Sequence, residues 1–479
     1  MMQEDRHLKI ALSLFATLSI VIGAMLFMQY QVYSEQDNPT NMEFSYSQEI
    51  EITYREDSLD IRHHFKNLPN DSVEIVWPES AVDRNCFLEM EYSCTRLNDN
   101  KTEFQSGENR SQSISYIIPL EDGLTSEKLM NNIYASLKSG SVKYSTVHIS
   151  TDSSVRGQWV TGLPQIGQQS LALVNYSMFR GTGQVRDLYW QESGLALQKK
   201  TDTLSIYANT NISVELGQTV DKLNEFGDEH IAIIQPNNIG LQKGYRMVFL
   251  PELTTATLQK EVLMAQVELL YTFVDSPVWL KNVIAMNLSG ETFGTPRALA
   301  VVDTLMNEMT EEQQADWSSR IEGLKGKKVS PAILDEELSA VFGNHTEYLS
   351  MNVDAEETYP FMFNDQRDVY VNGVLTEEID VILHEGKVLY TADALLHDIG
   401  YTTSVGSNGY YVNGETRVFR FPNAEHDFYV FNQRRYNTNT SPLSIIASTY
   451  YIEETWLQRL FLVDLQKDEQ SIRITTTAQ

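Results

Sequence analysis

The chain has 479 residues, which is too long for a single hydrophobic core, so about three domains are expected. It contains 36 Lys and Arg against 65 Asp and Glu, which gives a formal net charge of −29. A surface this acidic repels nucleic acid and anionic lipid head groups, so nucleic acid is excluded as a partner.

The N-terminal part contains an apolar run from Ile10 to Met28, which is long enough to span a bilayer. Arg6 and Lys9 precede the run, and polar and then acidic residues follow it. This charge pattern predicts a cytoplasmic N-terminus at 1–9, an uncleaved transmembrane anchor at 10–29 and an extracellular remainder held at the cell membrane. A cleaved signal peptide is the alternative, although no Ala-x-Ala site follows the run.

Residues 42–217 show the two-residue alternation of half-buried strands and are expected to form a β-sandwich. Ile50, Ile52 and Tyr54 alternate with polar residues, for example. Within this region we expect a short helix at 126–137 and a strand through Ile212 and Leu216. The chain's two cysteines, Cys86 and Cys94, are expected to form a disulfide, because exported cysteines tend to pair and no further metal ligands lie nearby.

Residues 218–350 are expected to form a mostly helical domain organised around the stretch 262–285. Two strands, at 231–234 and 245–249, precede an apolar helix, and a second short helix begins at Pro277. After these, the spacing predicts helices from Pro296, from the capping box of Thr310 and Gln313, and from Ser330-Pro331 to Gly343.

The helix pair resembles the zincin core of aminopeptidase-type metallopeptidases of the peptidase MA class. That family has V-L-x-H-E-x-x-H on the first helix and P-x-W-L-x-E-G-x-A on the second. The scaffold positions that match are Val262, Leu263, Pro277, Trp279, Leu280 and Ala285. The preceding SLDIRHHFKNLPNDSVEIVWPES is similar to the N-terminal β domain of such peptidases.

The chemical positions of that motif are degenerate. Ala265 and Leu269 stand where the family has its two histidines, Gln266 replaces the general-base glutamate, and Asn282 replaces the third zinc ligand. Alanine and leucine cannot bind zinc, and glutamine cannot accept a proton as a base. The resemblance therefore implies a pseudoenzyme with no metal, cofactor or catalytic residue. An ordinary amphipathic helix followed by a tryptophan-bearing turn is the alternative.

Residues 367–479 carry a second pattern, VYVNG at 369–373 followed by VILHEGKVLYTADALLHDIGYTTSV at 381–405. It resembles the stalk domain of Gram-positive envelope proteins that is similar to the N-terminal domain of copper amine oxidases. Positions that keep the frame of that family are Gly373, Gly386, Leu389, Leu395, Leu396, Gly400 and Tyr401. A looser second copy follows at 428–461, and the resemblance implies no copper.

No other catalytic pattern stands out. His384-Glu385 begins like H-E-x-x-H but lies in an expected strand and turn, and His63-His64 places neighbours on opposite faces of a strand. The sequence thus predicts a multidomain α+β protein with an anchor, a β-sandwich, a degenerate zincin-like domain and a small α+β stalk. Its expected function is non-catalytic binding of an envelope peptide or protein, with Trp279 and Glu268 in the former cleft. The alternatives are an active envelope hydrolase with an unrecognised site and a regulator of an envelope sensor kinase.

Overall fold

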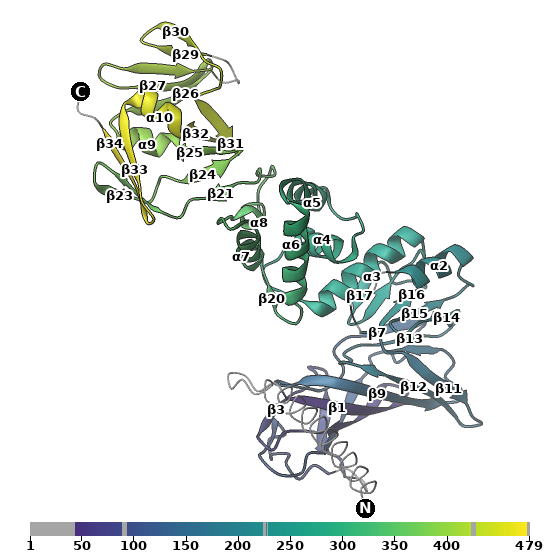
Figure 1. Cartoon of the computed structure of the whole chain (residues 1–479). Coiled ribbons are helices and arrows are strands. Elements are labelled where there is room, and N and C mark those ends of the chain that lie inside the picture. The colour runs from purple at the N-terminus through teal and green to yellow at the C-terminus, as the bar shows by residue number, and fades with distance from the viewer. Residues whose placement is uncertain (1–43, 89–92, 224–226, 228, 423–427, 477–479) are drawn as a thin grey trace, which may run out of the picture. The chain divides into compact units, whose positions relative to one another are not determined.

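A computed structural model describes residues 44–88, 93–223, 227, 229–422 and 428–476 (Figure 1). The chain divides into two compact units, unit 1 with residues 1–221 and 228–254, and unit 2 with residues 222–227 and 255–479. Strands and helices occur in both units, which confirms the multidomain α+β class. The five sequence-based domain boundaries stay a prediction.

The predicted anchor at 10–29 and the preceding residues 1–9 lie outside the described residues. In the part of the chain that the structure describes, no helix is both long enough and apolar enough to cross a membrane.

Unit 1 is built on a seven-stranded sheet with the order β11-β12-β9-β1-β2-β6-β4 among the described residues. Figure 1 shows β1, β9 and β12 side by side. Its strands are β1 (Ser45–Arg55), β2 (Ser58–Lys66), β4 (Val82–Cys86), β6 (Gln112–Pro119), β9 (Ser141–Asp152), β11 (Gln165–Ser170) and β12 (Val174–Thr182). The alternation predicted for β1 is present, because Ile50 and Ile52 are buried while Glu49 and Glu51 are half-buried. β1 pairs with β9 in parallel, whereas β2 joins β1 as an antiparallel hairpin.

Two smaller sheets share the hydrophobic core of that large sheet. One contains β5 (Glu103–Phe104), β3 (Val73–Val76) and β8 (Ser136–Leu137), and the other β10 (Gln158–Val160), β13 (Leu188–Gln191) and β7 (Glu127–Met130). The helix expected at 126–137 is therefore wrong. Leu129 and Met130 pair with β13 instead, and Asn132 adopts a left-handed φ of 51°, which ends the strand.

The last sheet of unit 1 has the order β14-β15-β16-β18-β17. Its strands are β14 (Ala196–Lys200), β15 (Leu204–Ala208), β16 (Ile231–Ile234), β17 (Gln242–Gly244) and β18 (Met247–Phe249). The strands β15, β16 and β18 run parallel and are wholly buried, as their continuous apolar sequences suggest. Helix α2 (Val214–Lys222) lies where we expected a strand, because the Ser213 hydroxyl accepts a hydrogen bond from Leu216 N and starts a helix.

The first part of unit 2 is helical, as the sequence predicts. Its helices are α3 (Thr255–Leu270), α4 (Val278–Ser289), α5 (Pro296–Glu308), α6 (Glu311–Gly323), α7 (Pro331–Phe342) and α8 (Tyr348–Met351). The short strands β19 (Thr272–Phe273) and β20 (Lys328–Val329) pair in parallel between them. The capping box of Thr310 and Gln313 and the left-handed C-cap of Gly343 are confirmed.

The C-terminal part of unit 2, residues 363–476, consists of small sheets around α9 (Ala392–Asp398) and α10 (Glu454–Phe461) (Figure 1). The first sheet contains β21 (Phe363–Asn364), β24 (Val381–His384), β25 (Lys387–Thr391), β32 (Thr449–Glu453) and β31 (Leu443–Ile446). The second contains β23 (Val374–Thr376), β22 (Asp368–Val371), β34 (Ser471–Thr476) and β33 (Val463–Lys467). The third contains β26 (Thr402–Gly406), β27 (Gly409–Asn413), β28 (Val418–Phe421), β29 (Phe428–Phe431) and β30 (Arg434–Asn437).

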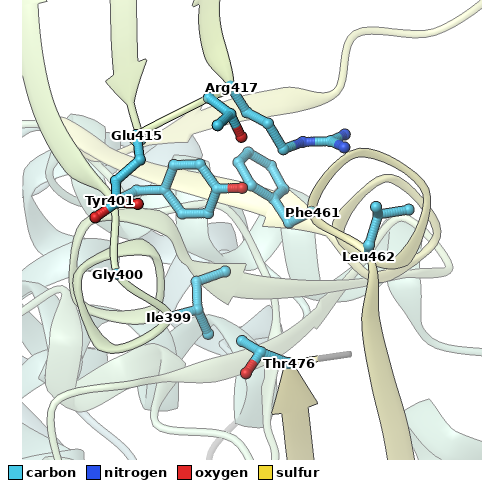
Figure 2. A pocket seen from close by; sticks show the side chains of 10 residues that line it. Ile399, Gly400, Tyr401, Glu415, Arg417, Phe461, Leu462 and Thr476 are labelled. Carbon is cyan, nitrogen blue, oxygen red and sulfur yellow. The ribbon is translucent and has the colours of Figure 1, made fainter. Parts of the chain in front are cut away.

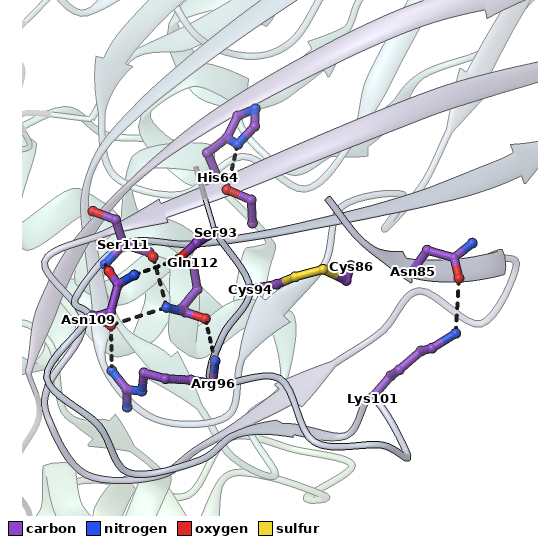
Figure 3. The surroundings of a disulfide bond; sticks show 11 residues. His64, Asn85, Cys86, Ser93, Cys94, Arg96, Lys101, Asn109, Ser111 and Gln112 are labelled. Carbon is purple, nitrogen blue, oxygen red and sulfur yellow. Dashed lines mark hydrogen bonds between the residues drawn. A yellow bond between two sulfur atoms is a disulfide. The ribbon is translucent and has the colours of Figure 1, made fainter. Parts of the chain in front are cut away.

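The predicted disulfide between Cys86 and Cys94 is present, with a Cα–Cα distance of 5.6 Å (Figure 3). The nearby Arg96 fixes the chain beyond it, because its guanidinium donates to the carbonyl oxygens of Pro69, Asp71, Gln105 and Asn109. The disulfide thus tethers the segment after β4 at the edge of the large sheet.

Candidate functional site

The candidate site lies on the helix pair α3–α4, whose two helices pack on each other. Ala265, Gln266 and Asn282 are buried at 8%, 2% and 2% exposure, and Leu269 is half-buried near the end of α3. Pro277 is the N-cap of α4, one residue before the first-turn position expected from the sequence. The structure therefore places three of the four degenerate positions inside the protein; that they form one former zinc pocket stays a prediction.

Asn282 connects three elements through its side-chain amide. Its Nδ2 donates to the Met264 Sδ on α3 at 3.0 Å, and its Oδ1 accepts from Thr295 N, the N-cap of α5, at 3.2 Å. Gly294 lies so close that a Cβ there would be 2.8 Å from Asn282 Oδ1. Both ends of this amide thus hold the α3–α4–α5 junction together.

Gln266 and Trp279 differ from Asn282 because their buried polar atoms have no partner within the described residues. Both amide atoms of Gln266 and the indole Nε1 of Trp279 are enclosed without a hydrogen bond. Trp279 belongs to the hydrophobic core of the helical region. A buried polar atom without a partner costs free energy. The packing of α3 on α4 therefore does not explain why Gln266 and Trp279 stand at these positions.

Glu268, predicted to lie in the cleft, is exposed on α3 and forms an ion pair with Lys281 of α4 at 3.1 Å. The Lys281 ammonium also lies 5.2 Å from the centre of the Phe273 ring. These contacts link the surfaces of the two helices, so Glu268 acts as a charged residue on the outer face of α3.

The residues at these positions do not fit zinc. Protein-bound zinc takes thiolate, imidazole or carboxylate ligands, and Ala265 and Leu269 provide only hydrocarbon. The Asn282 amide is already hydrogen-bonded on both sides. Across the described residues, no group of three or more His, Cys, Asp or Glu side chains is placed to hold a metal ion.

The helical region contains a hollow of about 290 Å³ between α4, α5, α6 and the loop after α4. Its wall combines apolar residues, among them Met286, Leu305, Met306 and Trp317, with the polar residues Glu291, Thr292 and Gln314. Asn287 adds a polar group: its Nδ2 donates to Ser318 Oγ at 3.2 Å, while its Oδ1 is buried without a partner. No sequence motif indicates this hollow, because its residues come from three helices and the loop after α4.

A second hollow, of about 240 Å³, lies in the C-terminal part of unit 2 (Figure 2). Tyr401 and Phe461 meet edge to face there at 5.1 Å, and Arg417 donates through Nη2 to the carbonyl oxygen of Leu460 at 2.7 Å. Burial raises the pKa of Tyr401, and the Arg417 guanidinium opposes that rise. Tyr401 is one of the residues that match the stalk-domain family, and these contacts show that it is part of the hydrophobic core.

The His384-Glu385 pair lies in a strand and turn, and it belongs to no group of metal ligands among the described residues. His384 lies at the end of β24, and its Nδ1 bonds the carbonyl oxygen of Phe361 at 2.9 Å, while Glu385 adopts a left-handed φ of 49° in the following turn. The expected strand and turn at this place are confirmed.

Comparison with solved structures finds M1 zinc metallopeptidases. One from Deinococcus radiodurans is matched at 11% identity and a TM-score of 0.40, over 66% of this chain and 94% of that chain. A point mutant of the enzyme from the same organism, bound to a Tyr-Ser-Ala substrate, is matched at 11% identity and a TM-score of 0.43, over 67% and 95%. No protein-family model and no curated protein matches the chain.

These neighbours belong to the aminopeptidase-type zincin class that the sequence resembles, at a coarse level of architecture. The resemblance of residues 367–479 to a stalk domain and the degenerate zinc motif on α3 and α4 stay predictions. The prediction that the chain is not an enzyme is wrong on this comparison, because the matched structures are those of enzymes.

Proposed function

We propose that the chain is a peptide-binding protein of the cell envelope, with the architecture of a metallopeptidase and an N-terminal membrane anchor. The observation that carries the proposal is the hollow between α4, α5 and α6. The apolar run at 10–28 and the charges that flank it support the anchored, extracellular placement.

The hollow has the two features that a peptide segment requires. The apolar part of its wall can bury a hydrophobic side chain, and Met286 and Met306 can adapt to different shapes because thioether side chains are flexible. The polar side chains of Thr292 and Gln314 on the same wall can bond the peptide backbone next to that side chain. An apolar side chain beside an N–H donor is the repeating chemistry of a peptide.

The test uses the full-length chain and fluorescein-labelled tetrapeptides of the form Ala-X-Ala-Ala, in which X is Leu, Phe or Asp. The Leu and Phe peptides should bind more tightly than the Asp peptide. Val302→Trp fills the hollow and should weaken that binding about tenfold or more, because the apolar side chain loses its site.

Leu299→Trp is the matched control, since Leu299 is exposed on the same helix α5 and does not line the hollow. Equal affinity for all three peptides, or equal loss in both variants, would refute peptide binding at this site.

Hydrolysis of the bound peptide is the second candidate function, and the matched structures of peptidases are the reason for measuring it. Mass spectrometry of the same peptides after incubation with the protein, with and without a chelator, detects any cleavage. Cleavage that Val302→Trp abolishes would assign hydrolysis to this hollow, and cleavage that it leaves intact would place the catalytic site elsewhere.

A further inference from the structure

Unit 1 contains a larger hollow, of about 650 Å³. Three segments enclose it: the chain leaving β3 at 76–80, the connection between β7 and β8, and the turn at 184–186 before β13. Its volume is in the range of small-molecule sites, and Tyr134 and Leu137 of its lining belong to the hydrophobic core of the unit.

One side of the hollow is a fixed aromatic ring, that of Trp77. Its indole Nε1 donates to the carbonyl oxygen of Lys101 at 2.6 Å, its ring meets Tyr116 edge to face at 5.5 Å, and the Arg84 guanidinium lies 5.3 Å from its centre. Leu137 and the exposed Val76 add apolar surface beside it. The apolar part of the wall is therefore preorganised before any ligand arrives.

The rest of the wall presents polar groups that the protein itself does not use. Within the described residues, the side chains of Asn131, Asn132, Glu79 and Ser80 make no hydrogen bond to the rest of the protein. Amide, hydroxyl and carboxylate groups thus line one hollow with their bonding capacity unused.

Arg186 and Gln184 form an oriented pair at the edge of the hollow. The Arg186 Nε and Nη2 both donate to Gln184 Oε1 at 3.3 Å, and the guanidinium lies 4.4 Å from the centre of the Tyr245 ring. The Gln184 oxygen is therefore occupied, which leaves its Nε2 as a donor.

The balance of these groups selects a chemical class of ligand. A single cation, Arg186, opposes a single anion, Glu79, so the lining favours a neutral ligand over a phosphate or a carboxylate. An aliphatic ligand would leave the amides and hydroxyls buried without partners. A sugar ring has an apolar face for an aromatic wall and a rim of hydroxyls that both donate and accept hydrogen bonds.

We propose that this hollow is a binding site for a neutral saccharide, with Trp77 facing the sugar ring and Asn131, Asn132 and Glu79 bonding its hydroxyls. The site is separate from the peptide hollow of the helical region, so either can fail without the other.

The test is calorimetric titration of the full-length chain with three probes: cellotetraose, the tetramer of N-acetylglucosamine, and tetra-alanine. At least one sugar should bind at one site per chain, and the two sugars together show whether an acetamido group is recognised. Asn131→Ala and Glu79→Gln should each weaken sugar binding about fivefold or more, since the first removes an amide and the second replaces a charged acceptor oxygen with a donor.

Asn211→Ala is the control, because Asn211 is an exposed asparagine of the same unit outside the hollow. It should bind the sugar as the unaltered chain does. The proposal is overturned if neither sugar binds, if tetra-alanine binds in place of the sugars, or if both hollow variants retain full affinity.

Discussion

Asp335 is a buried residue of α7 whose carboxylate fixes the short helix α8. Its two oxygens accept hydrogen bonds from Leu349 N and Ser350 N, both at 2.8 Å, and the side chain is 3% exposed. Asp335→Ala would remove both acceptors from inside the protein. We expect the free energy of unfolding to fall by about 3 kcal/mol, measured by urea denaturation.

Asp335→Asn serves as the comparison for that variant, because its single carbonyl oxygen can replace one of the two acceptors. The free energy of unfolding of Asp335→Asn should fall by about half as much as that of Asp335→Ala. Because asparagine keeps the volume of aspartate, an Asp335→Asn variant as stable as the unaltered protein would mean that cavity formation, rather than hydrogen bonding, sets the cost of Asp335→Ala.

Gln266 allows the opposite prediction. Because both of its buried amide atoms have no partner, Gln266→Leu removes two unsatisfied groups and keeps most of the packing volume. We expect the variant to be more stable than the unaltered protein by about 1 kcal/mol in urea denaturation. A loss of stability would show that the amide is hydrogen-bonded in solution.

His63 gives a pH dependence. It is fully buried, its Nε2 bonds Gln48 Oε1 at 3.1 Å, and its Nδ1 has no partner. Burial and, to a smaller extent, the neighbouring His64 lower the pKa of His63 from 6.5 to about 3. Between these two values the unfolded chain binds the proton and the folded protein does not. Stability is therefore complete above about pH 6.5 and falls as the pH drops towards 3.

His63→Gln should flatten that dependence, because glutamine can still donate to Gln48 but does not titrate. Urea denaturation at about pH 7.5 and about pH 4.5 measures the difference, and we expect the drop in stability to shrink by about 2 kcal/mol in the variant. His64, whose pKa burial lowers to about 4, remains as a second source of acid sensitivity. An unchanged drop would exclude His63 as a source.

For single residues, the sequence drew attention to positions on α3 and α4 but could not show what surrounds them. It could show that Ala265 and Leu269 are unable to bind a metal, since that is a property of the side chains themselves. It could not show that Asn282 would be held by Met264 and Thr295, or that Asn287 would line a hollow. Those contacts depend on how three helices meet.

Among the elements, α6 is stabilised by its own first turn. The Thr310 hydroxyl accepts from Gln313 N at 3.3 Å, and Gln313 Oε1 accepts from Thr310 N at 3.0 Å. Thr310→Ala should lower the free energy of unfolding by about 1 kcal/mol, because α6 then has an unsatisfied N-terminus. Thr310→Ser keeps the hydroxyl and should show less than half of that loss in urea denaturation; a loss as large as that of alanine would contradict capping.

The elements that were predicted correctly carry their own start and stop signals. The helices α5, α6 and α7 begin at Thr295, Thr310 and Ser330, whose hydroxyls accept from the backbone three residues later. The segment 126–137 lacks such signals. Leu129 and Ile133 have helical spacing, but pairing of the segment with β13 outweighs it, and no local pattern reports that partner.

At the scale of the whole molecule, the single disulfide stabilises unit 1 by restricting the unfolded chain. Cys86 and Cys94 are separated by 8 positions, so their link closes a short loop. Replacing both with serine should lower the free energy of unfolding by about 2–3 kcal/mol on the chain-entropy estimate. A reductant should destabilise the unaltered protein by the same amount and leave the double variant unaffected, and any effect on that variant would point to another cause.

The pairing of β22 with β34 has a consequence for how the protein is made. The strand β22, near the start of the C-terminal part, is joined in parallel to Ser471–Thr476, about a hundred residues later. A ribosome must therefore release nearly the entire segment before β22 can pair with β34. Until then, β22 is an open sheet edge that a chaperone can shield from aggregation.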